Sequence, residues 1–114
     1  MPKLKNMTKE KIAMVAHIAE QWEDANLSEM DTILHICADL ELNFNIPFCV
    51  ELRGSTDGGE YWLQVEYYSK KLKKTIIWNY DWETSFVDAN ELVDTLIETA
   101  KDIESFEKKI SLKK

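Results

Sequence analysis

The sequence has little glycine or proline and no long apolar segment. Only three glycines and two prolines occur in 114 residues, whereas 45% of the residues are hydrophobic and 31% are charged. This composition excludes collagen-like and disordered chains and is typical of one compact domain. No apolar run approaches the roughly 18 residues of a membrane span, and no apolar signal segment follows the first lysines. We therefore expect a cytoplasmic protein that contacts no membrane.

Cysteine and histidine, the usual zinc ligands, are also scarce. The chain has two of each, with no Cys-x-x-Cys or His-x-x-x-His spacing. Two sets of polar residues do recur at helical spacing: Asp31, His35 and Asp39, and His17, Gln21 and Asp24. A zinc site needs three or four converging ligands, usually anchored by paired histidines or cysteines. Both sets are more typical of an exposed helix face, so the sequence predicts no metal and no cofactor.

The motifs of nucleophilic and phosphate chemistry are missing as well. Cys37 falls on an apolar helical stripe, where a cysteine is usually an inert hydrophobe, and Cys49 has only helical histidines to activate it. In a cytoplasmic protein both should be reduced thiols. The glycine-rich segment 54–59 lacks the Lys-Ser/Thr of a phosphate-binding loop. Glu66 lacks the lysine two residues further on that a metal-dependent nuclease hairpin would carry. We therefore predict that the protein is not an enzyme.

Positive charge is scarce and confined to short segments. The net charge is −7, and one arginine stands against thirteen lysines. Residues 15–66 carry eleven acids and Arg53 as their single base, and residues 81–107 carry nine acids and one lysine. Lysines gather in the loop 70–74 and at both ends of the chain. An acidic body of this kind repels nucleic acid and attracts a basic partner, although acidity also serves solubility alone.

Two amphipathic helices are predicted in the N-terminal part. The first should begin at Thr8 as N-cap, and the second at Ser28, with Asp31 three residues further on as in a capping box. Apolar residues recur at helical spacing on both. The predicted buried residues are Val15, Ile18, Ala19 and Trp22, flanked by Ile12 and Met14, and then Ile33, Ile36, Cys37 and Leu40.

After Pro47 the apolar period changes from 3.6 to 2, which predicts strands. Three alternating segments are separated by the turn 54–59, which contains Asp-Gly and Gly-Gly, and by the lysine-rich loop 70–74. The predicted core-facing series are Ile46, Phe48, Val50 and Leu52; Tyr61, Leu63, Val65 and Tyr67; and Ile76, Trp78, Tyr80 and Trp82. The intervening residues should form the outer face of an antiparallel sheet.

A long C-terminal helix is predicted from its capping signals. Asp88 and Glu91 form an N-cap and N3 pair, and Val87 and Leu92 fit a hydrophobic staple. Its buried side should consist of Leu92, Leu96, Ala100, Ile103, Phe106 and Ile110.

The predicted fold class is therefore α+β. Two N-terminal helices precede a three-stranded antiparallel β-meander, and the long C-terminal helix packs on one sheet face. Residues 1–114 should form a single domain, with frayed tails at 1–7 and 111–114.

Two surfaces are candidates for binding a partner. The first is the outer sheet face, where Trp62 and Tyr68 should stand among charged residues such as Glu66, as anchors do in protein–protein contacts. Trp82, at the end of the third strand, should also reach the surface. The second is an acidic stripe on the last helix, formed by Glu91, Asp94, Glu98 and Asp102. Its charges, about 5–6 Å apart, are sparser than the phosphates of a DNA strand.

These features favour a small, acidic, non-enzymatic binding protein. The specific prediction is an inhibitor of a basic, nucleic-acid-handling protein, which the chain would bind without contacting nucleic acid directly. Such a chain is similar in class to phage anti-CRISPR and anti-restriction proteins, some of which mimic DNA, and to nuclease immunity proteins. Two alternatives stay open. One is an accessory protein that homodimerises through the outer sheet face, and the other is a small-molecule-binding domain that uses the aromatic face of the third strand.

Overall fold

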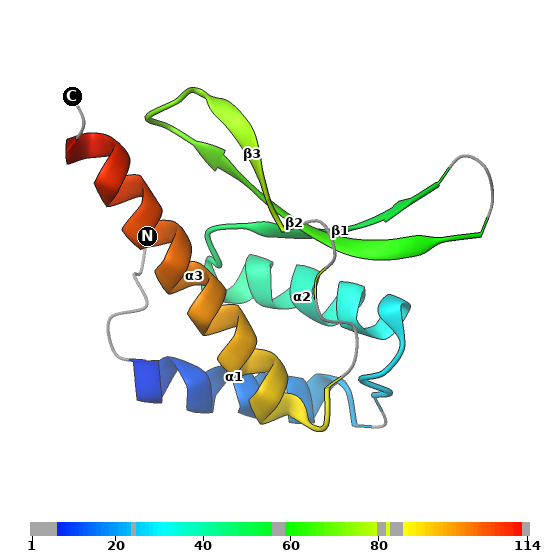
Figure 1. Cartoon of the computed structure of the whole chain (residues 1–114). Coiled ribbons are helices and arrows are strands. Elements are labelled where there is room, and N and C mark those ends of the chain that lie inside the picture. The colour runs from blue at the N-terminus through cyan, green and yellow to red at the C-terminus, as the bar shows by residue number, and fades with distance from the viewer. Residues whose placement is uncertain (1–6, 24, 56–58, 80–81, 83–85, 113–114) are drawn as a thin grey trace.

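The chain, seen in a computed structural model, is described at residues 7–23, 25–55, 59–79, 82 and 86–112. Its elements are, in order, α1 (Met7–Gln21), α2 (Met30–Phe44), β1 (Cys49–Gly54), β2 (Tyr61–Ser69), β3 (Lys74–Asn79) and α3 (Ala89–Leu112). The three strands form one antiparallel sheet in the order β1-β2-β3. All three helices lie on one side of this sheet (Figure 1), so the predicted α+β class and element order are confirmed.

The sheet forms one layer of the structure, and the helices lie beneath it (Figure 1). In Figure 1, α2 runs directly below the sheet and α1 lies farther from it, while α3 crosses α1 and rises towards the hairpin between β2 and β3. The core between them is continuous, and its fully buried side chains come from every layer. They include Met14 of α1, Leu40 of α2, Leu63 of β2 and Leu96 of α3, none more than 1% exposed. Burial of such side chains supplies the main stabilisation of the fold.

The buried stripe of α1 differs from the predicted one by a rotation about the helix axis. Met14 and Ile18 are buried, whereas Ala19 is exposed and Ile12 is 64% exposed. Ile18 is buried as predicted, and Val15 and Trp22 pack against the core. Ala19 and Ile12 were placed wrongly because α1 packs between two neighbours. It faces α3 with one side and α2 with the other, where His17 contacts Asp39. The spacing of apolar residues cannot predict that a polar residue such as His17 faces a neighbouring helix.

The predicted N-caps of the first two helices are also wrong. Helix α1 already begins at Met7, so Thr8 lies within it. Helix α2 begins at Met30 after Glu29, which makes no side-chain cap. Ser28 instead donates its backbone N–H and its hydroxyl to the Asn26 side chain, 3.1 and 2.6 Å away. Ser28 therefore takes part in the turn before the helix and does not cap it. Short polar side chains such as that of Asn26 often bond nearby backbone groups in this way.

On the inner sheet face the predicted alternation largely holds. Val50, Leu63, Val65 and Tyr67 are buried, as are Ile46 and Phe48 just before β1. Leu52, in contrast, is 38% exposed, so its predicted burial is wrong. Leu52 pairs with Leu63 near the far end of the β1–β2 hairpin, and Figure 1 shows this end projecting past α2.

An irregularity in β3 ends its strict alternation. Glu66 pairs with Ile77, whereas the preceding residue of β2, Val65, pairs with Asn79. Trp78 therefore has no partner across the strands, as in a β-bulge. Trp78 packs edge-on against Tyr67 and Phe106, with ring centroids 5.9 and 5.4 Å away. Beyond the strand, the Trp82 N–H donates to the Leu63 carbonyl at 2.9 Å. Tyr80, predicted in the same row, lies outside the described residues.

Helix α3 matches its prediction most closely. Asp88 Oδ1 accepts the Glu91 backbone N–H at 2.9 Å, which confirms the N-cap. Four predicted core residues are buried, and Phe106 packs against them. Three further residues of α3 are buried that the apolar spacing did not predict. Val93 and Ile97 widen the apolar stripe, and Thr99 satisfies its buried hydroxyl by donating to the Thr95 carbonyl at 2.8 Å. The hydrophobic staple is wrong, since Val87 is 85% exposed.

Candidate binding surfaces

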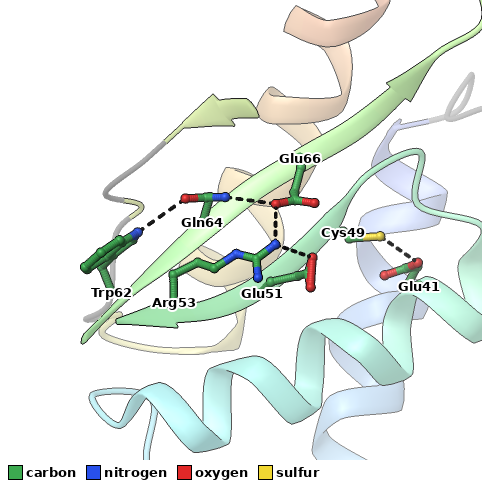
Figure 2. A network of polar contacts seen from close by, with 7 residues as sticks. All are labelled: Glu41, Cys49, Glu51, Arg53, Trp62, Gln64 and Glu66. Atoms are coloured by element: carbon green, nitrogen blue, oxygen red, sulfur yellow. Dashed lines mark hydrogen bonds and ion pairs between the residues drawn. The ribbon is translucent and has the colours of Figure 1, made fainter. Parts of the chain in front are cut away.

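The outer sheet face carries a connected network of polar side chains (Figure 2). Glu66 Oε2 accepts hydrogen bonds from Arg53 Nη2 at 2.9 Å and from Gln64 Nε2 at 2.8 Å. Arg53 also reaches Glu51 at 3.2 Å, and the Trp62 indole N–H donates to Gln64 at 3.4 Å. The strand register produces this arrangement because it pairs Arg53 with Trp62 and Glu51 with Gln64 on one face of the sheet.

The network influences the pKa of its central carboxyl group, that of Glu66. The hydrogen bond from Arg53, then that from Gln64, lowers the pKa of Glu66. The same contact with Glu66, then the charge of Glu51, raises the pKa of Arg53. Glu66 is therefore ionised at neutral pH and pairs with the Arg53 guanidinium in the central part of the face. These side chains are already oriented by one another, so a partner would order them at low entropic cost.

Cys49 stands at the edge of the same face. Its thiol donates to Glu41 Oε1 of α2 at 3.4 Å, a contact that Figure 2 shows beside the Arg53 network. Desolvation, then the charge and hydrogen bond of Glu41, raises the pKa of Cys49 to about 11. Burial raises the pKa of Cys37 to about 12. Both cysteines are free, and both are protonated at neutral pH. A thiol of this kind is a poor nucleophile.

Next to the polar network, the face presents exposed apolar groups. Tyr68 of β2 is 60% exposed and Ile77 of β3 is 43% exposed. Glu66 pairs with Ile77, and Tyr68 pairs with Thr75 on the same side of the sheet. Tyr68 and Ile77 are therefore diagonal neighbours, within reach of one another. An exposed aromatic and an exposed aliphatic side chain beside an ordered polar network resemble the core and rim of a protein interface.

The predicted outer-face residues are brought together, with one exception. Trp62, Glu66 and Tyr68 share one side of β2, with Trp62 half-buried among its neighbours. Trp82 does not join them: it is 4% exposed and packs against Phe86, with ring centroids 6.0 Å apart. The expectation that Trp82 reaches the surface is therefore wrong, because its backbone N–H donates to the Leu63 carbonyl of β2 and its indole packs in the core.

Sequence reasoning missed the organising role of Arg53 and Gln64. Gln64 is 5% exposed although it lies on the outer face, because Trp62 and Glu66 cover it from both sides along the strand. One signal was available in the sequence. Arg53 is the single arginine, and arginine is the residue whose planar fork can bind two carboxylates at once.

The acidic stripe of α3 lies on the helix side opposite the core. Asp94, Glu98 and Asp102 are exposed and Glu91 is half-buried. Asp94 is partly neutralised because Lys11 Nζ of α1 lies 2.9 Å from its Oδ1. The helix buries its opposite side against α1 and the core, so the stripe and the outer sheet face are separate surfaces.

The two histidines take part in contacts between helices. His17 Nε2 lies 2.5 Å from Asp39 Oδ2, and the His17 ring packs edge-on against Phe44 at 5.6 Å. The His35 ring lies 6.1 Å from the ring of Trp22. Among the described residues, no three His, Cys, Asp or Glu side chains form a group that could hold a metal ion. Asp24, one of the candidate ligands, lies outside those residues.

Comparison with known proteins adds no relative. The chain has no significant match to any protein-family model, curated protein or solved structure with which it was compared. Of the helices that the structure describes, none combines the length and apolar character needed to cross a bilayer.

Proposed function

We propose that this chain is a non-enzymatic binding protein that docks on a basic protein partner through its outer sheet face. The observation that carries the proposal is the combination on that face of exposed Tyr68 and Ile77 with a hydrogen-bonded acidic network. The apolar pair would supply buried area, and Glu66 would supply charge held in a fixed position. Aromatic anchors surrounded by polar groups are the usual energetic centres of protein interfaces.

The acidic stripe on α3 complements this docking site. Its charges face solvent, where they raise the encounter rate with a basic partner but add little to the affinity once contact is made. We therefore assign Glu98 and Asp102 to steering, and Tyr68, Trp62 and Glu66 to the contact itself. In the specific form of the proposal, the partner handles nucleic acid and is inhibited by occlusion of its basic surface. The acidic body and the basic surface expected of such partners support this form.

The proposed docking face is tested by two tyrosines of β2 that differ in the side of the sheet they occupy. Tyr68 and Tyr61 are 60% and 61% exposed, on the outer and the inner face respectively. The partner is first captured from the host with the wild-type chain, identified by mass spectrometry and purified. Its affinity is then measured for wild type, Tyr68→Ala and Tyr61→Ala. Tyr68→Ala should weaken binding about tenfold or more, as hot-spot truncations of roughly 2 kcal/mol do, while Tyr61→Ala should bind like wild type.

Steering is tested separately by reversing charge at Glu98 and Asp102. The double lysine variant should associate more slowly and lose much of its salt dependence, with a nearly unchanged dissociation rate. Inhibition is measured as loss of the partner's nucleic-acid binding or cleavage at a stoichiometric amount of the chain.

In the tyrosine experiment, equal affinities of the Tyr68 and Tyr61 variants would exclude the outer face as the docking site.

The small-molecule alternative has less support. The aromatic rings proposed to line such a site are engaged with protein: Trp78 packs against Tyr67 and Phe106, and Trp82 packs against Phe86. The sheet-face homodimer would use the same Tyr68 and Ile77 as a foreign partner. Light scattering of wild type and Tyr68→Ala distinguishes these two uses, because only a homodimer through the outer face predicts a mass above the monomer that Tyr68→Ala abolishes in the absence of any other protein.

A further inference from the structure

A groove lies at the projecting end of the β1–β2 hairpin, on the side of the sheet opposite to the proposed docking face. It has a volume of about 350 Å³, near the lower end of the range for binding pockets, and is lined by Leu52, Tyr61, Met30, Glu29 and Asp31. The apolar part comes from the inner hairpin face and the first residue of α2. The two carboxylates come from the start of the same helix.

The groove exposes apolar surface in a defined shape. Leu52 is 38% and Tyr61 61% exposed. The Tyr61 ring lies against the backbone of Gly54, where an added Cβ would stand 2.6 Å from the ring. Glycine at this position therefore lets the ring form one wall. Glu29 is oriented by the Asn26 side-chain amide, which donates to its Oε1 at 3.1 Å.

At the other end of the sheet, the β2–β3 loop has the complementary character. Residues 70–74 read Lys-Lys-Leu-Lys-Lys, and all five side chains are exposed, with Leu72 42% exposed. The loop conformation is held from within: the Leu72 backbone N–H donates to Ser69 Oγ at 3.1 Å, and Lys73 adopts a left-handed conformation with φ of 56°. An apolar side chain flanked by positive charges is thus presented on a structured turn.

We infer that the 70–74 loop of one copy of this chain docks in the Leu52–Tyr61 groove of a second copy. Leu72 would enter the apolar part, and the flanking Lys70 and Lys74 would face Glu29 and Asp31. The match is one of polarity and charge, because each surface has an apolar centre, and the charges beside it are negative at the groove and positive on the loop. It would also cover three apolar side chains, Leu52, Tyr61 and Leu72, that are largely exposed in a single copy.

The positions of the two surfaces set the form of the assembly. The hairpin between β1 and β2 and the hairpin between β2 and β3 project in opposite directions (Figure 1), so the loop cannot reach the groove of its own chain. Contact between copies is therefore head-to-tail, and it either closes reciprocally into a dimer or continues as an open chain. The buried area of one loop is far below the roughly 1,200–2,000 Å² of a stable interface, so association is weak and sensitive to salt.

The inference is tested by charge reversal at each end. The purified chain should show a weight-average mass that rises with concentration in sedimentation equilibrium at low salt, and that returns to the monomer value at about 1 M salt, where the Debye length is about 3 Å. The groove variant Glu29→Lys/Asp31→Lys and the loop variant Lys70→Glu/Lys74→Glu should each stay monomeric under the same low-salt conditions.

Restoring complementarity should restore association. An equimolar mixture of the groove and loop variants should associate again, as should a single chain carrying all four reversals. This rescue separates the inference from a simple loss of folding, since misfolded variants would not recover one another. For the apolar part, Leu72→Ser should reduce association at least several-fold, whereas Leu42→Ser, at a leucine that is 83% exposed outside both surfaces, should not.

Either of two results would overturn the inference: a monomer at every concentration in low salt, or association that the single-end reversals leave unchanged. The inference does not rest on the proposed function. Substitutions of Tyr61 and Tyr68 distinguish self-association from binding of a foreign partner. Tyr61→Ala should weaken self-association and Tyr68→Ala should not, which is the reverse of the pattern expected for a partner on the outer face.

Discussion

At the scale of single residues, Glu107 of α3 connects the long helix to the sheet. Its Oε2 accepts the hydroxyls of Tyr67 and Ser69, each at 2.9 Å. Ser69 is fully buried and Tyr67 is 5% exposed. Burial, then the hydrogen bond and charge of Glu107, raises the pKa of Tyr67, so its hydroxyl stays a donor at neutral pH. Glu107 thus satisfies two buried hydroxyls with one carboxylate oxygen.

Removing this carboxylate should be costly. Glu107→Ala leaves two buried hydroxyls without their acceptor, and we expect the free energy of unfolding to fall by about 1–3 kcal/mol. Chemical denaturation monitored by tryptophan fluorescence measures the change. Glu104→Ala, at an exposed site of the same helix, should stay within about 0.5 kcal/mol of wild type. Equal effects of the two substitutions would show that the carboxylate does not stabilise the contact between helix and sheet.

Glu66 should make stability depend on pH through its contact with Arg53. A carboxyl whose pKa is lowered by folding stabilises the native state above its ordinary pKa of about 4.3, and this stabilisation is lost as the pH falls through the lowered value. The difference in unfolding free energy between wild type and Glu66→Gln should therefore be present at pH 7 and shrink towards zero in strong acid. Urea denaturation across this range measures it.

Arg53 is the matched control for this dependence. In an Arg53→Gln background the main cause of the lowered pKa is gone, so Glu66→Gln should have a smaller effect at pH 7 than in wild type. An unchanged effect would mean that Gln64, the second donor to Glu66, accounts for the stabilisation without Arg53.

At the scale of elements, α3 depends on its N-cap. Asp88 accepts the Glu91 backbone N–H, and the staple that would support the same helix start is absent because Val87 is exposed. Asp88→Ala should therefore cost about 1 kcal/mol, within the usual range of about 0.5–2, measured by thermal or urea unfolding. Asp88→Asn keeps a capping oxygen and should lose much less. Equal losses for both variants would contradict the capping role.

The bounds and the buried side of an element were predictable from the sequence where local signals alone determined them. Helix α3 combines a cap with a long apolar stripe, and both lie where the sequence places them. Helix α1 packs on two neighbours, so its buried side could not be read from apolar spacing alone. The inner side of β2 follows the period of two, whereas Trp78 interrupts it in β3 through a bulge that no local signal announces.

The binding surfaces were predictable to a similar extent. Alternation places Trp62, Glu66 and Tyr68 on the outer face because β2 keeps a period of two on both sides of the register shift at Val65 and Glu66. Trp82 was misplaced because its position depends on the path of the chain beyond β3. The groove at Leu52 could not be foreseen either, since its walls come from the hairpin and from the start of α2, two segments that are separate in the sequence.

At the scale of the whole molecule, charge is distributed at the expense of stability. Asp94, Glu98 and Asp102 repeat at a spacing of four residues along α3, and like charges at this spacing destabilise a helix by about 0.2–0.5 kcal/mol per pair. The net charge of −7 adds general repulsion. Solubility requires net charge but does not require it in a row; in the function proposed above, the row would attract a basic partner.

This argument predicts opposite effects of one substitution on stability and on binding. Glu98→Lys converts two repulsive pairs, with Asp94 and Asp102, into attractive ones, and turns one attractive pair, with Lys101, into a repulsive one. It should raise the free energy of unfolding by about 0.5 kcal/mol at low salt, less at high salt because exposed charges are screened. The same variant should associate more slowly with a basic partner. Urea denaturation at two salt concentrations and association kinetics measure the two effects. Glu104→Lys, also on α3 but outside the row, is the matched control for the change in net charge. If Glu98→Lys were more stable and bound as fast as wild type, the row would have no role in attraction.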